Sequence, residues 1–387
     1  MLKIKLMNKI AKIGTDIFSR NTYEVGDKLQ GEDAIMVRST ALHDLEFSPN
    51  LRAIARCGAG VNNIPVERCT KQGIVVFNTP GANANAVKEL AIASLILASR
   101  DILGGVEWVK TLTGTENVAK AVETGKSAFV GRELAGKTLG VIGLGAIGGM
   151  VANTAISLGM NVMGYDPYIT AKAAWSLAPS VRQASDYADI FKNCDYISLH
   201  VPATPQTKNM INKETLAQMR NGVRILNLSR ADLVNSEDLK QAIDNKKVAV
   251  YVTDFPTEET VGVQGIIAIP HLGASTVESE DHCAVMAAQQ LDEFLSCGNI
   301  RNSVNFPTLS IARSEKPRVC LMHDNIPNML AQIATVFSSR NINIENFANG
   351  SKGEVAYTIV ETNAPASDDL VFDLRNIQGV FGVRTFE

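Results

Sequence analysis

Short apolar runs alternate with longer amphipathic stretches from the N-terminus to about residue 285. The short runs are typical of buried strands, and the stretches between them have the length and spacing of helices. Repeated strand–helix units predict an α/β fold with doubly wound parallel sheets that carry helices on both faces. The expected strands are 34–37, 51–55, 74–77, 139–142, 161–165, 195–201, 224–228, 248–254 and 265–269.

The pattern changes near residue 317, after a mixed stretch at 301–316 that we interpret as a linker. Strands at 318–322, 343–347, 355–361 and 382–386, with helices at 328–340 and 368–377, give a ferredoxin-like βαββαβ order. A long helix from Ser275 to about Cys297 can return the chain to the first domain. We therefore expect a flavodoxin-like domain (1–100 and 286–305), an inserted Rossmann-like domain (101–285) and a small third domain (317–387).

The stretch 138–166 has the order strand, glycine turn, helix, strand and acid. Gly143 permits a tight turn, Gly145 leaves room for a pyrophosphate, and Gly148 allows close helix–strand packing. The helix N-terminus offers free N–H groups to phosphates. Asp166 would accept hydrogen bonds from ribose hydroxyls and repel a 2′-phosphate, so NAD is the expected cofactor rather than NADP. A purely structural βαβ turn is the alternative.

Three basic residues lie where parallel strands end or helices begin. Arg38 and Arg56 each follow a predicted strand, and Lys88 lies near the start of the helix that runs to about Arg100. Ligands of open α/β sheets gather at the carboxyl ends of the strands. Together the three cations predict an anion site, although each alone would be interpreted as a solvated surface charge.

Arg230, Glu259 and His271 also follow predicted strands. Oxidation of a 2-hydroxy acid needs a base for the hydroxyl proton and a cation for the carboxylate. Histidine suits the first role and arginine the second, while a carboxylate can orient the imidazole. The alternatives are a structural histidine and a solvated glutamate.

Composition narrows the function further. The net charge is −3, 45% of residues are hydrophobic and 20% are charged, without any basic block. Nucleic acid and anionic membranes are therefore poor candidate partners. The six scattered cysteines show no metal-binding spacing and suit a reducing compartment. The N-terminus lacks the apolar core of a signal peptide, so we expect a cytoplasmic protein without a bound metal.

Several motifs occur in the order found in D-2-hydroxyacid dehydrogenases: RCGAGVNNI, NTPGANANAVKEL, GKTLGVIGLGAIG, ISLHVPATPQTKNMI, ILNLSRADLV and PHLGAST. The chain resembles this family over its first ~300 residues. The resemblance implies that Arg230 binds substrate carboxylate and carbonyl, that His271 is the acid/base, and that Glu259 is its partner. A one-residue shift would select Glu258 instead.

The resemblance also implies binding residues around these three. The cofactor-binding residues are Gly143, Gly145, Ala146, Ile147, Gly148, Asp166, His200, Val201, Pro202, Asp254 and Gly273. The substrate-binding residues are Arg38, Ser39, Arg56, Gly58, Ala59, Gly60, Asn83 and Lys88. The positive charge of this second set favours a small phosphorylated 2-hydroxy acid. A reductase of unphosphorylated acids and a non-catalytic NAD sensor are the alternatives.

The C-terminal module resembles an ACT domain, which in this family binds serine. The run HDNIPN matches the family's effector loop except at Asn328, where glycine is usual. His323, Asn325 and Asn343 are the implied contacts for L-serine across a pair of modules. The departure at Asn328 puts this control in doubt, and a module kept only for assembly is the alternative. The family resemblance further implies a homodimer or homotetramer.

Overall fold

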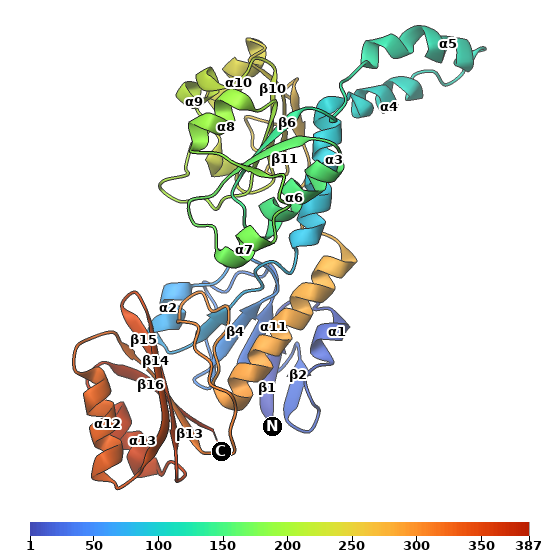
Figure 1. Cartoon of the computed structure of the whole chain (residues 1–387). Coiled ribbons are helices and arrows are strands. Elements are labelled where there is room, and N and C mark those ends of the chain that lie inside the picture. The colour runs from blue at the N-terminus through green and yellow to red at the C-terminus, as the bar shows by residue number, and fades with distance from the viewer. Residues whose placement is uncertain (387) are drawn as a thin grey trace. The chain divides into compact units, whose positions relative to one another are not determined.

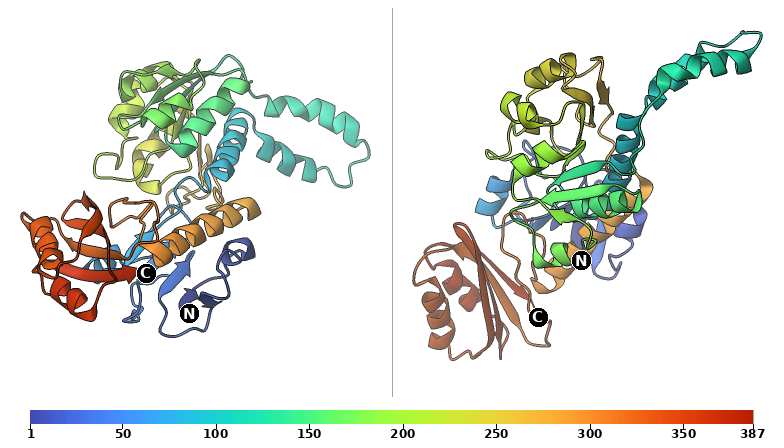
Figure 2. Two further views of the ribbon diagram at one scale, coloured as in Figure 1. Left: turned by 60° about the horizontal axis from the view of Figure 1, so that its bottom comes forward. Right: turned by 45° about the horizontal axis from the view of Figure 1, so that its top comes forward.

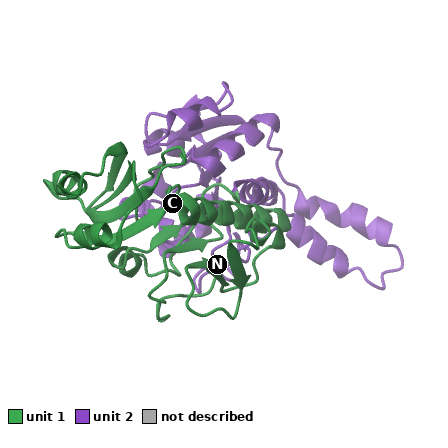
Figure 3. Ribbon diagram, turned by 90° about the horizontal axis from the view of Figure 1, so that it is seen from below, with its two compact units in different colours: residues 1–83, 277–387 green, residues 84–276 purple. Residues whose placement is uncertain are grey.

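The chain divides into two compact units, which Figure 3 shows in different colours. The computed structural model describes residues 1–386. The first unit comprises residues 1–83 and 277–387, and the second comprises 84–276. Between residues 1 and 386, no helix is both long and apolar enough to cross a membrane.

A five-stranded parallel sheet in the order β2-β1-β3-β4-β5 forms the centre of the first unit. This is the flavodoxin-like order that the sequence predicted. Side chains alternate across it: Ala34 and Met36 of β3 face the core shared with α11, while Ile35 and Val37 face the core on the other side. The elements are β1 (Leu2–Leu6), α1 (Lys12–Thr15), β2 (Tyr23–Gly26), β3 (Ala34–Val37), β4 (Ala53–Arg56), α2 (Val66–Lys71), β5 (Val75–Phe77) and α11 (Val277–Cys297).

The second unit contains a seven-stranded parallel sheet in the order β12-β11-β10-β9-β6-β7-β8. Read from β8, this is the Rossmann order 3-2-1-4-5-6 with one added strand. The strands are β6 (Thr138–Ile142), β7 (Asn161–Tyr165), β8 (Arg182–Gln183), β9 (Tyr196–Leu199), β10 (Val223–Asn227), β11 (Val248–Thr253) and β12 (Ile266–Ala268). The helices beside them are α3 (Ala84–Ser99), α6 (Ala146–Ser157), α7 (Ala171–Trp175), α8 (Tyr187–Asn193), α9 (Lys213–Gln218), η2 (Ala231–Leu233) and α10 (Ser236–Asp244).

The units divide the chain at residues 84 and 277, not at the expected boundaries of 100/101 and 285/286. Helix α3 belongs to the second unit because Val87, Ala91 and Leu95 are buried in the core of its sheet. Helix α11 begins at Val277, two residues after the expected start at Ser275. The Ser275 hydroxyl donates to the His271 carbonyl at 3.5 Å.

The second unit contains a helical arm that the sequence did not predict as a separate part of the domain. It consists of α4 (Ile102–Lys110), α5 (Val118–Gly125) and the 3-10 turn η1 (Lys126–Phe129). Figures 1 and 2 show these helices standing away from the second sheet. None of their residues is buried, and the Trp108 and Phe129 rings, 5.3 Å apart, hold the hairpin together.

Residues 318–386 fold as the predicted βαββαβ module, with an antiparallel sheet in the order β14-β15-β13-β16. Its helices cover one sheet face, where Val319 and Leu321 pack (Figure 1). On the other face, Cys320, Met322 and Tyr357 enter the core of the first sheet. The elements are β13 (Arg318–Asp324), α12 (Met329–Ser339), β14 (Ile344–Lys352), β15 (Val355–Thr362), α13 (Asp368–Arg375) and β16 (Val380–Phe386).

Residues 301–316 are not the free linker that we expected. Ser303 forms a bridge with Phe77, and the Asn305 side chain accepts a hydrogen bond from Val76 N at 2.9 Å. Phe306 is fully buried in the core beneath β13 and β15. The segment therefore fills the joint between the first sheet and the C-terminal module.

Candidate functional site

The glycine turn after β6 has the geometry that close cofactor approach requires. Gly143 has φ = +90°, and a Cβ there would lie 2.5 Å from the His200 carbonyl oxygen. A Cβ at Gly148 would lie 1.9 Å from the Gly143 oxygen, whereas a Cβ at Gly145 would meet no atom within 4 Å. Two glycines thus permit internal packing, while the third leaves open space beside the backbone.

The start of α6 offers unused hydrogen-bond donors beside this open space. The helix begins at Ala146, and its first internal bond runs from Gly149 N to Gly145 O. Ala146, Ile147 and Gly148 are therefore at positions whose N–H groups have no acceptor within the helix, and no side chain caps this end. Such an end attracts a phosphate through its N–H groups and its dipole.

Asp166 ends β7 beside the same turn. Its carboxylate accepts hydrogen bonds from Leu144 N and Tyr168 N, both at 2.9 Å. These bonds fix the carboxylate next to the glycine turn, which is where a ribose would be recognised.

His200 follows β9 and packs against the glycine turn, with Val201 and Pro202 continuing the loop. Its Nε2 lies 2.8 Å from the Ser198 hydroxyl, and its Nδ1 is buried without a protein partner. Burial lowers the pKa of His200 to about 4, so the imidazole is neutral at physiological pH. The neutral ring can accept or donate a hydrogen bond without placing charge beside the cofactor site.

Asp254 lies directly after β11 and is 1% exposed. Its Oδ2 accepts a hydrogen bond from Gly273 N at 3.2 Å, while Oδ1 is buried without a protein partner. Burial raises the pKa of Asp254, an effect that His271, the Gly273 N–H and Arg230 oppose. A buried acceptor that lacks a donor fits the carboxamide NH₂ of nicotinamide. The residues of the second unit therefore fit NAD.

Arg230 lies in a loop that is held by hydrogen bonds from the buried side chain of Asn227. Asn227 Nδ2 donates to Arg230 O at 2.8 Å, and its Oδ1 accepts from Ser229 N at 3.2 Å. The Arg230 guanidinium is solvent-exposed and donates to Ser229 O at 2.6 Å. Asn227 was missed from the sequence, although a polar residue at the end of an apolar strand was a usable signal.

Phe255 joins Arg230 and His271. Its ring centroid lies 4.5 Å from that of His271, and the Arg230 guanidinium lies 5.7 Å from the same ring. The imidazole of His271 is otherwise exposed. The two residues expected to handle the proton and the carboxylate thus contact one aromatic ring, that of Phe255, which no sequence motif indicated.

The expected pairing of Glu259 with His271 does not form. Within residues 1–386, no ion pair joins His271 to Glu259 or to Glu258. Hydrogen bonds between Thr257 and Thr260 close a tight turn, and Glu259 lines a surface hollow with Asp232 and Glu237. The charge of His271 acts instead on the pKa of Asp254, where it opposes the rise that burial causes.

The first unit contains Arg38 and Ser39 in the loop after β3. The Asn8 side chain fixes this loop, because its Oδ1 accepts from the backbone N–H groups of Arg38, Ser39 and Thr40 at 2.9–3.3 Å. The Arg38 guanidinium forms an ion pair with Glu280 of α11 at 2.7 Å. Arg38 therefore has a protein carboxylate as partner.

Arg56 ends β4 and lies beside Arg38, whose carbonyl accepts from Arg56 Nε at 3.1 Å. The guanidinium occupies the space that a Cβ at Gly58 would need, since such a Cβ would lie 1.8 Å from Nη1. The Gly58, Ala59 and Gly60 loop is tied to the next strand end by the bond from Asn78 Nδ2 to Ala59 O at 2.6 Å. The adjacent strand ends thus bring two arginines together, as predicted.

Asn83 and Lys88 lie in different units. Asn83 is the last residue of the first segment of unit one, and Lys88 is on α3 in unit two. The Lys88 ammonium lies 3.7 Å from a carboxylate oxygen of Glu89.

A single C-terminal module does not gather the three expected serine contacts. His323 is 2% exposed, with Nδ1 2.8 Å from Asp324 O and Nε2 2.8 Å from Thr358 Oγ1. Asn325 binds Gly353 O near the β14–β15 turn, whereas Asn343 precedes β14 at the opposite end of the sheet. Asn328 adopts φ = +66°, a conformation that asparagine tolerates better than most residues.

Comparisons with known proteins agree with this geometry. The profile of the family "D-isomer specific 2-hydroxyacid dehydrogenase, NAD binding domain" matches residues 93–274. The chain is 31% identical over 408 aligned positions to D-3-phosphoglycerate dehydrogenase 1 of Saccharomyces cerevisiae, covering 95% of this chain and 83% of that protein. It is 33% identical to the D-3-phosphoglycerate dehydrogenase of Synechocystis, covering 86% of this chain but only 62% of that relative's length.

A solved structure of NAD⁺-bound 3-phosphoglycerate dehydrogenase from Entamoeba histolytica is also similar. It matches with a TM-score of 0.62 and 27% identity, and the match covers 80% of this chain and 99% of that one. Together with the glycine turn, Asp166 and Asp254 of the second unit, these likenesses show that the chain belongs to the NAD-dependent D-2-hydroxyacid dehydrogenase family.

Proposed function

We propose that this protein catalyses the oxidation of 3-phosphoglycerate by NAD⁺ to 3-phosphohydroxypyruvate, NADH and a proton, the first step of L-serine synthesis. The observation that carries the proposal is the contact of Arg230 and His271 with one ring, that of Phe255. The likeness to the yeast dehydrogenase over 95% of the chain supports the phosphorylated substrate.

His271 would take the proton from the substrate 2-hydroxyl, because imidazole exchanges protons near neutral pH. Arg230 would hold the substrate carboxylate through paired N–H donors. NAD, when bound, supplies the hydride acceptor. In the cofactor site, the α6 N-terminus would bind the pyrophosphate, Asp166 the ribose and Asp254 the carboxamide. Asp254 also assumes the electrostatic role first expected of Glu259.

Arg56 and Arg38 are candidates for the substrate phosphate, because they end neighbouring strands and the Arg56 side chain lies against the Arg38 carbonyl. Binding of a phosphate by Arg38 would require that it exchange Glu280 for the ligand.

Three further proposals concern assembly, control and location. We propose a homodimer or homotetramer, because the helical arm leaves apolar side chains exposed. L-serine binding would need two modules, because Asn325 and Asn343 lie at opposite ends of one sheet. We place the protein in the cytoplasm, in keeping with six free, buried cysteines.

The test is NADH oxidation by the purified protein with 3-phosphohydroxypyruvate, hydroxypyruvate, glyoxylate or pyruvate, with and without L-serine. We expect kcat/KM for the phosphorylated substrate to exceed the others by about 100-fold, since a bound phosphate adds charge-assisted hydrogen bonds. Turnover of unphosphorylated acids alone would contradict the substrate assignment. NADH binding without any turnover would favour the sensor alternative.

Two variants test the residue roles. His271→Ala should lower kcat by about 10³-fold with the Kd for NADH within a few-fold, because the residue acts on the proton. Wild-type turnover would remove His271 from the mechanism. Arg56→Gln should raise the KM for the phosphorylated substrate more than that for hydroxypyruvate, and equal increases would show that Arg56 does not bind the phosphate.

A further inference from the structure

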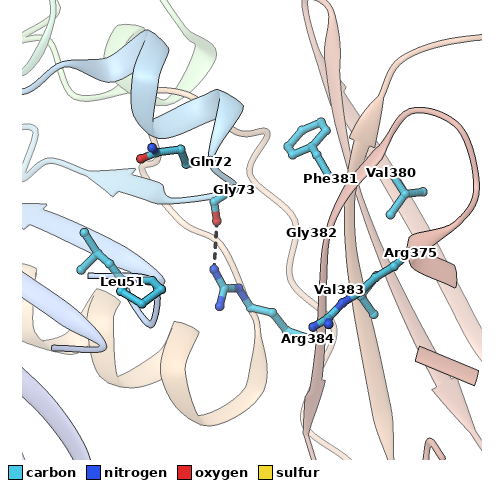
Figure 4. A pocket seen from close by; sticks show the side chains of 10 residues that line it. Leu51, Gln72, Gly73, Arg375, Val380, Phe381, Gly382, Val383 and Arg384 are labelled. Carbon is cyan, nitrogen blue, oxygen red and sulfur yellow. Dashed lines mark hydrogen bonds between the residues drawn. The ribbon is translucent and has the colours of Figure 1, made fainter. Parts of the chain in front are cut away.

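A cavity of about 390 Å³ lies where the C-terminal module meets the first sheet. Both parts belong to the first compact unit, and Figure 4 shows the side chains around the cavity. One wall comes from the loop before β4 and the turn before β5, and the other from α13 and β16. Its lining includes Leu51, Gly73, Arg375, Phe381, Val383 and Arg384.

Two glycines allow the walls to approach closely. Gly73 has φ = +65°, and a Cβ there would lie 3.3 Å from the Met322 sulfur and 3.9 Å from the Gly382 Cα. A Cβ at Gly382 would lie 3.0 Å from the same sulfur. The cavity therefore lies beside a region where the backbones of the two walls approach closely.

Arg384 is a cation whose hydrogen-bonding capacity is largely unused. Its Nη2 donates to Gly73 O at 2.9 Å, as Figure 4 shows, and its guanidinium lies 6.0 Å from the Phe294 ring. Its Nε is buried without a partner. Burial and then the charge of Arg52 lower the pKa of Arg384 to about 10, so the side chain still carries its charge at neutral pH.

No carboxylate of the described residues neutralises this charge. Asp33 is the carboxylate whose charge acts on the pKa of Arg384, but it forms an ion pair with Arg52 at 3.3 Å. Asp373, two residues before Arg375, forms an ion pair with Arg340. The second cavity arginine, Arg375, makes no ion pair with any residue of 1–386 and extends from α13 toward the same cavity (Figure 4).

We propose that this cavity binds a small anion, through a phosphate or carboxylate group held between the guanidinium groups of Arg375 and Arg384. Both guanidinium groups line the cavity and are suited to paired contacts with the oxygens of an oxyanion. Leu51, Phe381 and Val383 leave room for a short apolar portion, and the volume suits a small metabolite.

Occupation of the cavity would stabilise the folded state, because only the folded chain brings Arg375 of α13 and Arg384 of β16 to one cavity. The proposal is independent of the dehydrogenase assignment, since it uses neither the NAD site nor His271. Its test therefore measures binding and thermal stability without enzyme turnover.

The probes are inorganic phosphate and succinate, each compared with sodium chloride at equal ionic strength. The readouts are isothermal titration calorimetry and the thermal unfolding midpoint of the full chain. At ten times Kd, a ligand of the folded state should raise the midpoint by about 2 °C. A response to phosphate alone identifies a phosphate site, and a response to succinate alone identifies a carboxylate site.

Variants assign the response to the cavity. Arg375→Gln should lose most of it, and Arg384→Lys, which keeps the charge but not the guanidinium, should raise Kd about tenfold. Arg20→Gln, an exposed arginine of the same unit away from the cavity, should respond as the wild type does. Arg56→Gln should also keep the response, which separates this cavity from the proposed substrate phosphate site.

An unchanged response in Arg375→Gln would overturn the proposal, as would the absence of a response to both anions in the wild type. Loss of the response in Arg56→Gln with retention in Arg375→Gln would also overturn it, because the bound anion would then be at the strand ends. Should Arg384→Lys fail to fold, Arg375→Gln alone still decides, because Arg375 is exposed and makes no ion pair.

Discussion

Phe255 contacts both residues to which we assign chemistry, so its removal should affect both. Phe255→Ala should lower kcat by about 10-fold, because the His271 ring loses the surface that orients it, and should raise the KM for substrate because Arg230 loses a contact. Phe255→Tyr keeps the ring and should retain at least a third of wild-type kcat. Both variants should keep the thermal midpoint within a few degrees.

Equal losses in the alanine and tyrosine variants would contradict this role. So would a loss in kcat that accompanies an equal loss of NADH affinity, because the ring is assigned to Arg230 and His271 and not to the cofactor.

His200 should make the folded state sensitive to acid. The pKa of its imidazole is lowered to about 4 by burial, whereas an unfolded chain has a value near 6.5. Between these two values the unfolded state binds more protons, so the free energy of unfolding falls as the pH falls through this window. The expected loss between pH 7.5 and pH 5 is about 2 kcal/mol from this residue.

The measurement is urea denaturation at several pH values, comparing the wild type with His200→Asn. The variant lacks the titrating group, and its stability should fall less steeply below pH 6.5. Parallel curves for the two proteins would show that His200 is not the cause.

At the scale of elements, two substitutions in the glycine turn and α6 should affect stability and cofactor binding separately. Gly145→Ala should leave the thermal midpoint within about 1 °C, because its Cβ meets no protein atom, but should raise the Kd for NADH about tenfold by obstructing the pyrophosphate. Gly148→Ala should lower the midpoint by several degrees, because its Cβ would overlap the Gly143 carbonyl. Calorimetry and NADH fluorescence titration check the two effects. Equal destabilisation by both substitutions would contradict the assignment.

The elements were largely predictable from sequence, but one side-chain pairing was not. Strands β3 and β7 have the expected bounds, because the apolar pattern is a local signal. Glu259 was expected from an ungapped match to the family motif, but the Thr257–Thr260 turn directs it elsewhere. Turn geometry of this kind depends on side-chain hydrogen bonds that no periodicity reveals.

At the scale of the whole molecule, the arm should direct self-association. Ile102, Leu103, Val106 and Val109 are each 41–49% exposed on α4, and no residue of α4 or α5 is buried. The double substitution Leu103→Asp/Val106→Asp should yield a smaller species by light scattering with an unchanged circular dichroism spectrum. Ile13→Asp, on α1 of the first unit and similarly exposed, is the matched control. An unchanged mass would place the subunit interface elsewhere.

The docking of the C-terminal module was the main feature that the sequence did not predict. Strand β13 is apolar at both alternating sets of positions, so a second buried face was readable in principle. The surface that this face packs against could not be predicted. Met322 and Tyr357 share a core with residues more than 200 positions earlier, such as Met36 and Phe77. The mixed composition of residues 301–316 gave no sign that this segment packs through three buried residues, Ser303, Asn305 and Phe306.

This discontinuous core has a consequence for synthesis on the ribosome. The strands of the first sheet emerge first, but Phe294, Phe306 and Tyr357, which complete one of its faces, are translated some 200–300 residues later. At about 5–20 residues per second, that face stays uncovered for roughly 10–60 s, while the inserted second unit emerges whole and can fold. The nascent N-terminal sheet should therefore be the main client segment for chaperones, and slower translation of the second unit should lower the yield of folded protein.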